Sequence, residues 1–541
     1  MYTITHKWQK ILILGVILLL GLAIRSYNLN SPSIGYHNMK ENESLSIAHE
    51  MKSSNDYIKK KVYFLNAFEQ GPAIKKYGEL PLVPYQILIS WRLFGENLWG
   101  GRLFNIIFSV SGIIVIYFLA LLLFNNVTLA LFCALLLAIM PLNVFFSRNL
   151  QAESPAFFFM LLGSLFYLRF ASSLKKYNLF LGGLSFSLAW AYRENFLLGI
   201  LPFAFCLPFK RILLDRKQIL RYILVFFIPY LVTFFVVLWF KTLAGGGFVL
   251  QLSSLKWAKL LEVFLPSYWS RYGSNILWFA VAENYTAVFS VLALLGILLA
   301  FLKGNGLLNR YIIGWVFTIV PFLMLSSQEI YQQSFAQMPF LIMVAISCAY
   351  ALLFVAQTLN RNIKKEILIY LIIITILIAI PFIYGSIYRM HATVFLGEDV
   401  AGETLRELTI PGERVFLLTH PQGYGIARYA QRYVGWPSGF QDFKDKENKF
   451  KIRYIGFYPS EYLFALENNS PELFSYIQNN YHIKEVGMLE ESGRLAYFIL
   501  EKGTGQNLKD SLRKLSGQVR PRAIYKLFGR FIFFYTVRPV N

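Results

Sequence analysis

Long apolar runs are the feature that most constrains how this chain can fold. Five runs, at residues 11–24, 103–124, 127–144, 223–240 and 367–383, approach or exceed the ~20 residues that cross ~30 Å of hydrocarbon as a helix. Hydrophobic residues make up 56% of the 541 residues and the mean hydropathy is +0.48, which is more apolar surface than one globular core can bury. Because lipid leaves backbone amides no water to bind, the pattern predicts a polytopic α-helical membrane protein.

Counting the shorter runs as well, we expect about eleven transmembrane helices. They are predicted at residues 8–26, 101–124, 127–146, 155–171, 177–191, 196–208, 220–240, 286–302, 309–326, 337–357 and 366–388. The two segments between residues 177 and 208 are short for full crossings, and one bent hairpin is the alternative. The first run has no small-residue cleavage site after it, so we interpret it as a retained helix and not as a signal peptide.

Lys and Arg in the short loops all fall on one side under this assignment. They lie near residues 7–10, 175–176, 210–221, 303–310 and 361–365. The positive-inside rule then predicts a cytoplasmic amino terminus in a plasma or inner membrane. The loops 27–100, 147–154, 241–285 and 327–336, and everything after residue 388, are predicted to be extracytoplasmic.

The remaining chain is predicted to form a transmembrane domain at residues 1–388, a soluble extracytoplasmic α/β domain at 389–501 and a basic, aromatic tail at 502–541. In the second domain, strands are expected at 414–419 and 495–500 and helices at 400–408 and 471–479. In the tail, Lys526 and Arg530 would share one helix face against lipid headgroups, or the segment is frayed.

The net charge of +22 does not indicate nucleic acid, because cytoplasmic loops and the tail account for much of it. The three cysteines, Cys133, Cys206 and Cys348, all lie in predicted spans and are expected to be packing residues. No thiolate metal cluster is available to the loops.

Two predicted outward loops carry acids at the membrane edge. Glu41 and Glu43 lie in the long first loop, and Glu153 follows Arg148 in a short loop between two apolar spans. A carboxylate there can deprotonate an acceptor hydroxyl that attacks a sugar carbon. The alternatives are a charged helix start that meets water, snorkelling, and a helix-dipole partner at the start of the helix.

Together the loops resemble those of the GT-C glycosyltransferases of the protein O-mannosyltransferase and lipid A aminoarabinose transferase type. The resemblance covers nearly the whole chain: residues 37–48 match an acidic motif after the first helix, residues 147–155 a second one, and residues 77–103 the stretch before the second helix. Many relatives have Asp-Glu in the first motif, and an overlay puts Lys40 at their Asp and Glu41 at their Glu. The resemblance implies Glu41 as general base, Glu43 as second choice, and Glu153 as a residue that positions the acceptor or a cation.

The donor in such enzymes is a polyprenyl-phosphate sugar, whose phosphate needs cations near the bilayer. Arg193 is the first candidate, with an internal pair to Glu194 as the competing interpretation. The secondary candidates are Arg148, Lys75 and Lys76. For the substrate we expect His37 to orient a carboxylate, or to be only a polar loop residue, and Tyr331 and Gln332 to bind sugar hydroxyls.

The resemblance therefore implies a glycosyltransferase of the cell envelope, which would transfer a hexose or pentose with inversion from a polyprenyl phosphate to an extracytoplasmic protein, lipid or glycan. The acids are too few and scattered to assign a metal, and a divalent cation is left open. A non-catalytic lipid or solute transporter is the main alternative, although no matched half-repeat is visible. A receptor-like protein leaves the acids of the first loop unexplained.

Overall fold

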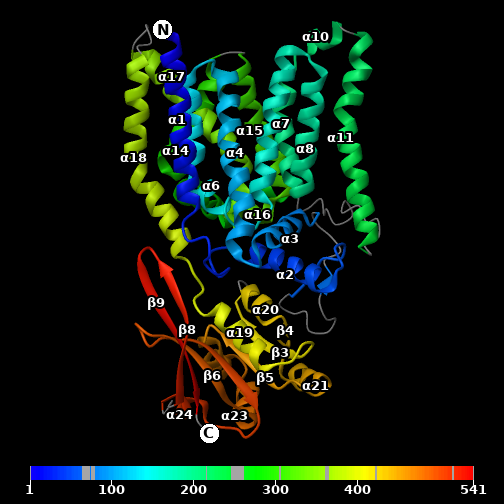
Figure 1. The fold of residues 1–541 in the computed structure, drawn as a ribbon, viewed down its shortest axis with the longest axis vertical. Coiled ribbons are helices and arrows are strands. Elements are labelled where there is room, and N and C mark those ends of the chain that lie inside the picture. The colour runs from blue at the N-terminus through cyan, green and yellow to red at the C-terminus, as the bar shows by residue number, and fades with distance from the viewer. Residues whose placement is uncertain are drawn as a thin grey trace. The chain divides into compact units, whose positions relative to one another are not determined.

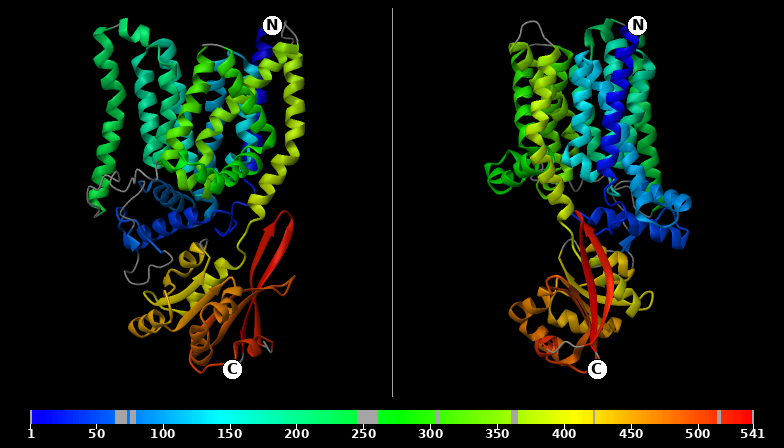
Figure 2. Two further views of the ribbon diagram at one scale, coloured as in Figure 1. Left: turned by 180° about the vertical axis from the view of Figure 1, so that it is seen from behind. Right: turned by 60° about the vertical axis from the view of Figure 1, so that its left-hand side comes forward.

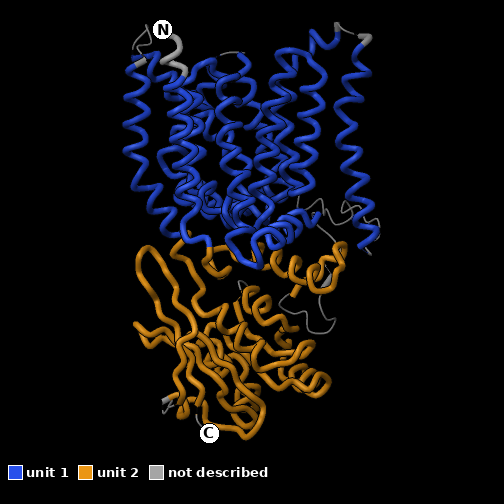
Figure 3. The backbone as a smooth tube through the Cα atoms, in the orientation of Figure 1, with its two compact units in different colours: residues 1–29, 77–389 blue, residues 30–76, 390–541 orange. Residues whose placement is uncertain are grey.

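The chain forms two compact units in a computed structural model that describes residues 2–63, 73–74, 80–214, 216–244, 261–303, 306–359, 365–420, 423–513 and 517–539. Unit 1 comprises residues 1–29 and 77–389, and unit 2 comprises residues 30–76 and 390–541 (Figure 3). Each unit is thus assembled from two stretches that are far apart in the sequence. The first loop, predicted as part of the transmembrane domain, is divided between them.

Unit 1 is helical, and its long helices run side by side (Figures 1 and 2). Its elements are α1 (Tyr2–Arg25), α3 (Leu82–Phe94), α4 (Leu98–Phe124), α5 (Val127–Ile139), α6 (Pro141–Phe146), α7 (Glu153–Ser173), α8 (Lys176–Tyr192), η1 (Glu194–Ile200), α9 (Leu201–Cys206), α10 (Phe209–Leu214), α11 (Arg216–Leu243), η3 (Glu262–Phe264), α13 (Pro266–Trp278), η4 (Phe279–Asn284), α14 (Thr286–Leu302), α15 (Leu307–Leu325), α16 (Ser327–Gln332), η5 (Ser334–Phe340), α17 (Leu341–Leu359) and α18 (Lys365–Ala392).

Most residues of every predicted span are helical, but not every span is one long helix. Within the described residues, seven helices are long and apolar enough to cross a membrane, or eight if one bent pair is a single span. That pair, Pro266–Asn284 and Thr286–Leu302, is bent by 109°. Val127–Ile139 and Glu194–Cys206 are shorter apolar helices. The chain is therefore a multi-pass membrane protein, while eleven crossings remain a prediction.

A buried arginine explains why the predicted span 127–146 is broken into α5 and α6. The guanidinium of Arg25 is fully buried and donates to the backbone oxygens of Leu137 at 3.1 Å and Ala138 at 2.8 Å. The last carbonyls of a helix have no partner within it, so Arg25 caps α5 where Pro141 starts the next helix. Its Nε also donates to Ser147 at 3.0 Å, which fixes the start of the acidic second loop.

Unit 2 contains a seven-stranded sheet in the order β4-β3-β5-β7-β6-β9-β8. Its elements are α2 (Met39–Ser54), β1 (Lys61–Val62), β2 (Ala73–Ile74), α19 (Glu398–Leu408), β3 (Arg414–Thr419), α20 (Tyr424–Ala430), β4 (Tyr433–Gly435), α21 (Phe440–Phe450), β5 (Tyr454–Tyr458), α22 (Glu461–Asn469), α23 (Pro471–Asn480), β6 (Tyr481–Leu489), β7 (Leu495–Lys502), α24 (Leu508–Arg513), β8 (Gly517–Leu527) and β9 (Arg530–Pro539). The two strands and two helices predicted in this part are confirmed.

The sheet is parallel at one end and antiparallel at the other. β3 pairs in parallel with both β4 and β5, and the other pairs are antiparallel. The chain leaves β3 through α20 toward β4 on one side, and leaves β5 through α22 and α23 toward β6 and β7 on the other. The carboxyl ends of β3 and β5 therefore form a topological switch point, the place where open α/β sheets hold their ligands.

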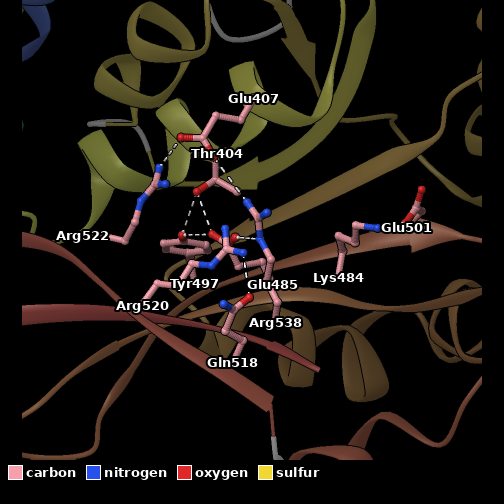
Figure 4. A network of polar contacts seen from close by, with 10 residues as sticks. All are labelled: Thr404, Glu407, Lys484, Glu485, Tyr497, Glu501, Gln518, Arg520, Arg522 and Arg538. Carbon is pink, nitrogen blue, oxygen red and sulfur yellow. Dashed lines mark hydrogen bonds and ion pairs between the residues drawn. The ribbon is translucent and has the colours of Figure 1, made fainter. Parts of the chain in front are cut away.

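The prediction of a helical or frayed tail was wrong, because β8 and β9 form a hairpin that extends the sheet. Two of its basic residues, Arg522 and Arg538, form ion pairs with acidic residues of unit 2 (Figure 4). Arg522 pairs with Glu407 at 2.8 Å, and Arg538 pairs with Glu407 at 3.3 Å and with the fully buried Glu485 at 2.6 Å. The predicted boundary at residue 501 thus cuts through one sheet.

Residues 30–54 are part of the core of unit 2. Ile34, 1% exposed, lies in the same apolar cluster as Val400 and Ile426. Its carbonyl accepts from the backbone N–H of Phe395 at 2.8 Å, and Gly35 forms an isolated antiparallel bridge with Val394. The acidic first motif is therefore anchored to the carboxy-terminal half of the chain.

Candidate active site

Three charged side chains meet in unit 1. Arg193 lies with its Nε 3.5 Å from Glu153 and with one terminal nitrogen 2.9 Å from Glu329. The side chains of Glu153 and Arg193 are 3% and 9% exposed, whereas that of Glu329 is 41% exposed. Buried charges are stable only when paired, so this pairing accounts for the burial of both residues.

Helix ends place these three groups. Glu153 is the first residue of α7, where the N-terminal dipole favours a carboxylate, and Arg193 is the C-cap of α8, where the dipole favours a cation. Glu329 lies in the short helix α16. The hydroxyl of Tyr192 accepts a hydrogen bond from Gln86 of α3, which ties the end of α8 to a third helix.

Arg148 has a structural role in unit 1. It donates to the backbone oxygen of Asn28 at 2.9 Å and to that of Tyr27, so it fixes the chain that leaves α1. The other two secondary donor candidates, Lys75 and Lys76, lie outside the described residues.

The predicted sugar-binding residues lie on the same short helix as Glu329. Tyr331 stacks on Tyr272 of α13, with ring centroids 3.7 Å apart and planes 8° apart. Gln332 is exposed and accepts from Gln328 at 3.4 Å. The stacked tyrosine pair gives one side of α16 a flat aromatic surface, which is a surface that sugar rings can pack against.

In unit 2, Glu41 lies in the first turn of α2 and is 4% exposed. The hydroxyl of Ser33 donates to its carboxylate at 2.7 Å. Glu43 instead forms a looser pair with Lys40 at 3.8 Å. Ser33 contacts the carboxylate of Glu41 more closely than Lys40 contacts that of Glu43, and the choice of Glu41 before Glu43 as the base stays a prediction.

Further hydrogen bonds fix the chain around Glu41. The side-chain amide of Asn38 donates to Glu398 at 2.7 Å, and that of Asn42 donates to the carbonyl of Ser33 at 2.8 Å. The backbone N–H of Ser33 donates to the hydroxyl of Tyr429 at 3.2 Å. Hydrogen bonds from residues before α2 and within its first turn therefore fix the acidic motif at the amino end of this helix.

His37 lies in the turn before α2, with a positive φ of 52° and its ring 4.1 Å from that of Tyr36. The side chain is buried, and this burial lowers the pKa of His37 to about 4. The imidazole is consequently neutral at physiological pH, and its role in orienting a carboxylate stays a prediction.

The structure brings Glu153 and Arg193 together, but Glu41 and Glu153 belong to different units, so their convergence in one pocket stays a prediction. Sequence reasoning missed three residues: Glu329, Ser33 and Glu398. Glu329 did carry a signal, since it is the one acid between Glu283 and Glu366. Ser33 and Glu398 carry no such signal, because their contacts with Glu41 and Asn38 follow no sequence motif.

Within the described part of the chain, no group of three or more His, Cys, Asp or Glu residues could hold a metal ion. The three cysteines are buried and unbridged.

Comparison with known proteins supports this description. The family model of dolichyl-phosphate-mannose-protein mannosyltransferases matches residues 78–241, a range that contains both Glu153 and Arg193. No curated protein shows a significant sequence match to the chain.

Several solved structures are similar in fold. The Archaeoglobus fulgidus oligosaccharyltransferase in the apo form is 13% identical, with a TM-score of 0.58 over 91% of this chain and 74% of that one. ArnT from Cupriavidus metallidurans in the apo state is 14% identical, with a TM-score of 0.54 over 92% of this chain and 98% of that one. ArnT bound to undecaprenyl phosphate is also 14% identical, with a TM-score of 0.52 over 91% and 97%. The resemblance expected from the sequence is confirmed: the chain has the fold of the GT-C membrane glycosyltransferases.

Proposed function

We propose that this protein transfers a sugar from a polyprenyl-phosphate carrier to an extracytoplasmic acceptor. The observation that carries the proposal is the Glu153–Arg193 pair, because both residues fall within the stretch that matches a mannosyltransferase family and meet at 3.5 Å. ArnT has been solved with undecaprenyl phosphate, and the archaeal oligosaccharyltransferase with dolichol phosphate and a peptide. These structures support a lipid-linked donor for the present chain.

In the proposed reaction, the acceptor hydroxyl attacks the anomeric carbon of the sugar from the face opposite the phosphate. Glu41 takes the proton of that hydroxyl, the bond from the anomeric carbon to the phosphate oxygen breaks, and the polyprenyl phosphate leaves with the electron pair. The configuration at the anomeric carbon is thereby inverted.

Charge on the departing phosphate requires a cation, and Arg193 is the residue proposed to supply it. Arg193 keeps its buried bond to Glu153, which orients the guanidinium, while the half-exposed Glu329 gives up its position to the phosphate. Tyr331 and Gln332, on the same short helix as Glu329, are proposed to bind the sugar hydroxyls. A divalent cation near Glu153 would add to the same stabilisation.

The test is transfer in membrane fractions supplied with radiolabelled polyprenyl phosphates carrying mannose, glucose, galactose or aminoarabinose. Glu41→Gln and Glu153→Gln should each lose at least about 100-fold in turnover, the usual range for a general base or a charge-positioning group. Glu194→Gln, at an exposed acid next to Arg193, is the matched control and should keep wild-type turnover. Full turnover in both Glu41→Gln and Glu153→Gln would refute the site, and uptake without sugar release would indicate a transporter.

A further inference from the structure

The switch point of the unit 2 sheet is covered by the protein's own chain. Residues 394–398 lie across the carboxyl ends of β3 and β5: the ring of Phe395 is 4.7 Å from that of His420, and the hydroxyl of Tyr458 donates to the carbonyl of Leu396 at 3.2 Å. Glu398 packs against the start of α20 so closely that a Cβ on Gly425 would be 2.8 Å from its carboxylate. The place where such sheets hold a ligand is thus filled from within.

The segment that covers the switch point is also the one that binds the acidic motif. Val394 and Phe395 pair through their backbones with Gly35 and Ile34. Glu398, which is fully buried, accepts the side-chain amide of Asn38. The sheet therefore holds residues 34–38 where another α/β domain would hold a small molecule.

A second connection runs from α20 to Glu41 itself. The hydroxyl of Tyr429 accepts the backbone N–H of Ser33, and the hydroxyl of Ser33 donates to the carboxylate of Glu41. Ser33 is 1% exposed and also accepts from Asn42 through its carbonyl, so its backbone is fixed on both sides of its side chain. A displacement of Ser33 would therefore lengthen or break its hydrogen bond to the Glu41 carboxylate.

We propose that Tyr429 and Glu398 are positioning residues for Glu41, with Tyr429 acting through Ser33 and Glu398 through Asn38. This inference rests on the proposed role of Glu41 as general base. It assigns the carboxy-terminal domain to the catalytic machinery: the domain holds the base in place and need not bind the acceptor itself.

The chemical state of Glu398 sharpens the test. Burial raises the pKa of Glu398 well above its ordinary value, which favours the neutral carboxyl, a group similar in shape to the amide of glutamine. Glu398→Gln keeps an acceptor oxygen for Asn38, whereas Glu398→Leu removes it. Comparing the two variants separates the hydrogen bond from the side-chain volume.

The experiment measures the pH dependence of kcat/KM with the radiolabelled polyprenyl-phosphate sugar that the wild type turns over. Ser33→Ala removes the hydrogen bond that stabilises the charged form of Glu41, so the acidic limb of the profile should move up by about one pH unit. Tyr429→Phe and Glu398→Leu should move it in the same direction by roughly half as much and lower kcat about tenfold. Glu398→Gln, which keeps the acceptor for Asn38, should have the same pH profile as the wild type. Tyr535→Phe, which removes a hydroxyl of β9 that donates to Glu490 at 3.3 Å, is the control.

Hydrogen exchange of the peptide containing residues 33–45 gives a readout that needs no substrate. It should become faster in Tyr429→Phe and Glu398→Leu and stay unchanged in Tyr535→Phe. An acidic limb that stays in place in all variants, while Glu41→Gln is inactive, overturns the positioning roles and leaves the proposed function standing. Turnover retained by Glu41→Gln overturns both.

Discussion

At the scale of single residues, Arg193 illustrates how one side chain is shared between folding and a candidate reaction. Its ion pair with Glu153 is buried, whereas in its ion pair with Glu329 the glutamate side chain is 41% exposed. An exposed pair contributes little to stability, because water screens it and two long side chains must be ordered. The Glu329 carboxylate therefore occupies a position on Arg193 that a phosphate can take.

Replacing Glu329 by Gln should consequently improve donor binding. Without the competing carboxylate, the KM for the polyprenyl-phosphate sugar is expected to fall several-fold, while kcat changes little. Steady-state transfer measurements over a range of donor concentrations provide the check, with Glu194→Gln as the neighbouring acid for comparison. A higher KM in Glu329→Gln would mean that this carboxylate binds substrate and does not compete with it.

Asp399 provides a prediction for pH. Burial raises its pKa to about 6 from an ordinary value of 3.8, although the hydroxyl of Tyr525 donates to it at 2.6 Å. The folded state therefore binds more protons than the unfolded state between these two values, so the contribution of Asp399 to stability is present below pH 3.8 and is lost as the pH rises through 6. Asp399→Asn removes this loss.

We expect Asp399→Asn to raise the Tm of the detergent-solubilised protein by several degrees at pH 8 and to leave it unchanged near pH 4. Differential scanning fluorimetry at the two pH values measures this. Asp510→Asn, at an exposed residue of α24, is the control and should have no effect at either pH. An equal gain at both pH values would show that ionisation of Asp399 is not the cause.

At the scale of elements, helices and strands with strong apolar periodicity were predictable, and the terminal hairpin was not. β3 (Arg414–Thr419) extends only one residue beyond its apolar run, residues 415–418, at each end. The turn between β8 and β9 consists of Phe528 and Gly529, both with positive φ, of 47° and 83°. Such two-residue turns usually carry Asn-Gly or Asp-Gly, so Phe at the first position concealed the hairpin.

The hairpin is held to α19 by ion pairs, and these provide a prediction for the element. Arg538→Met removes the ion pair at 2.6 Å from the buried Glu485 and leaves the hydrogen bonds from Thr404 and Tyr497. We expect the free energy of unfolding to fall by about 3 kcal/mol. Arg520→Met is the matched control on β8, because Arg520 contacts the exposed Gln518 (Figure 4). The Tm of both variants measures the difference. A similar small change in both would mean that Glu485 is satisfied without Arg538.

At the scale of the whole molecule, the sequence predicted a helical membrane part followed by an α/β domain, but not that residues 30–54 would join that domain. Local periodicity reports which face of a helix is apolar; it does not report which distant surface that face will meet. The bond between Asn38 and Glu398 spans 360 positions, and no spacing in the chain indicates it. The same applies to Ser33 and Tyr429.

Ile34→Ala tests this joining of distant segments. Ile34 lies in a cluster made largely of residues beyond 400, so truncation should cost about 3 kcal/mol through lost burial and the cavity left behind. Ile410→Ala, at a residue that is 71% exposed, is the control. Chemical unfolding of the full chain in detergent gives both values. If the two variants are equally stable, the first loop does not contribute to the core of unit 2.

The split composition of unit 2 has a consequence for biosynthesis. The ribosome makes the acidic motif early, but its holding partners Glu398 and Tyr429 emerge some hundreds of residues later. Until then the hydrogen-bond partners of Ser33 and Asn38 have not been synthesised. Closing so long a loop is also entropically unfavourable before the sheet has formed. In a nascent polypeptide Glu41 would thus lack these contacts, and the proposed base would be positioned only after Glu398 and Tyr429 have been translated.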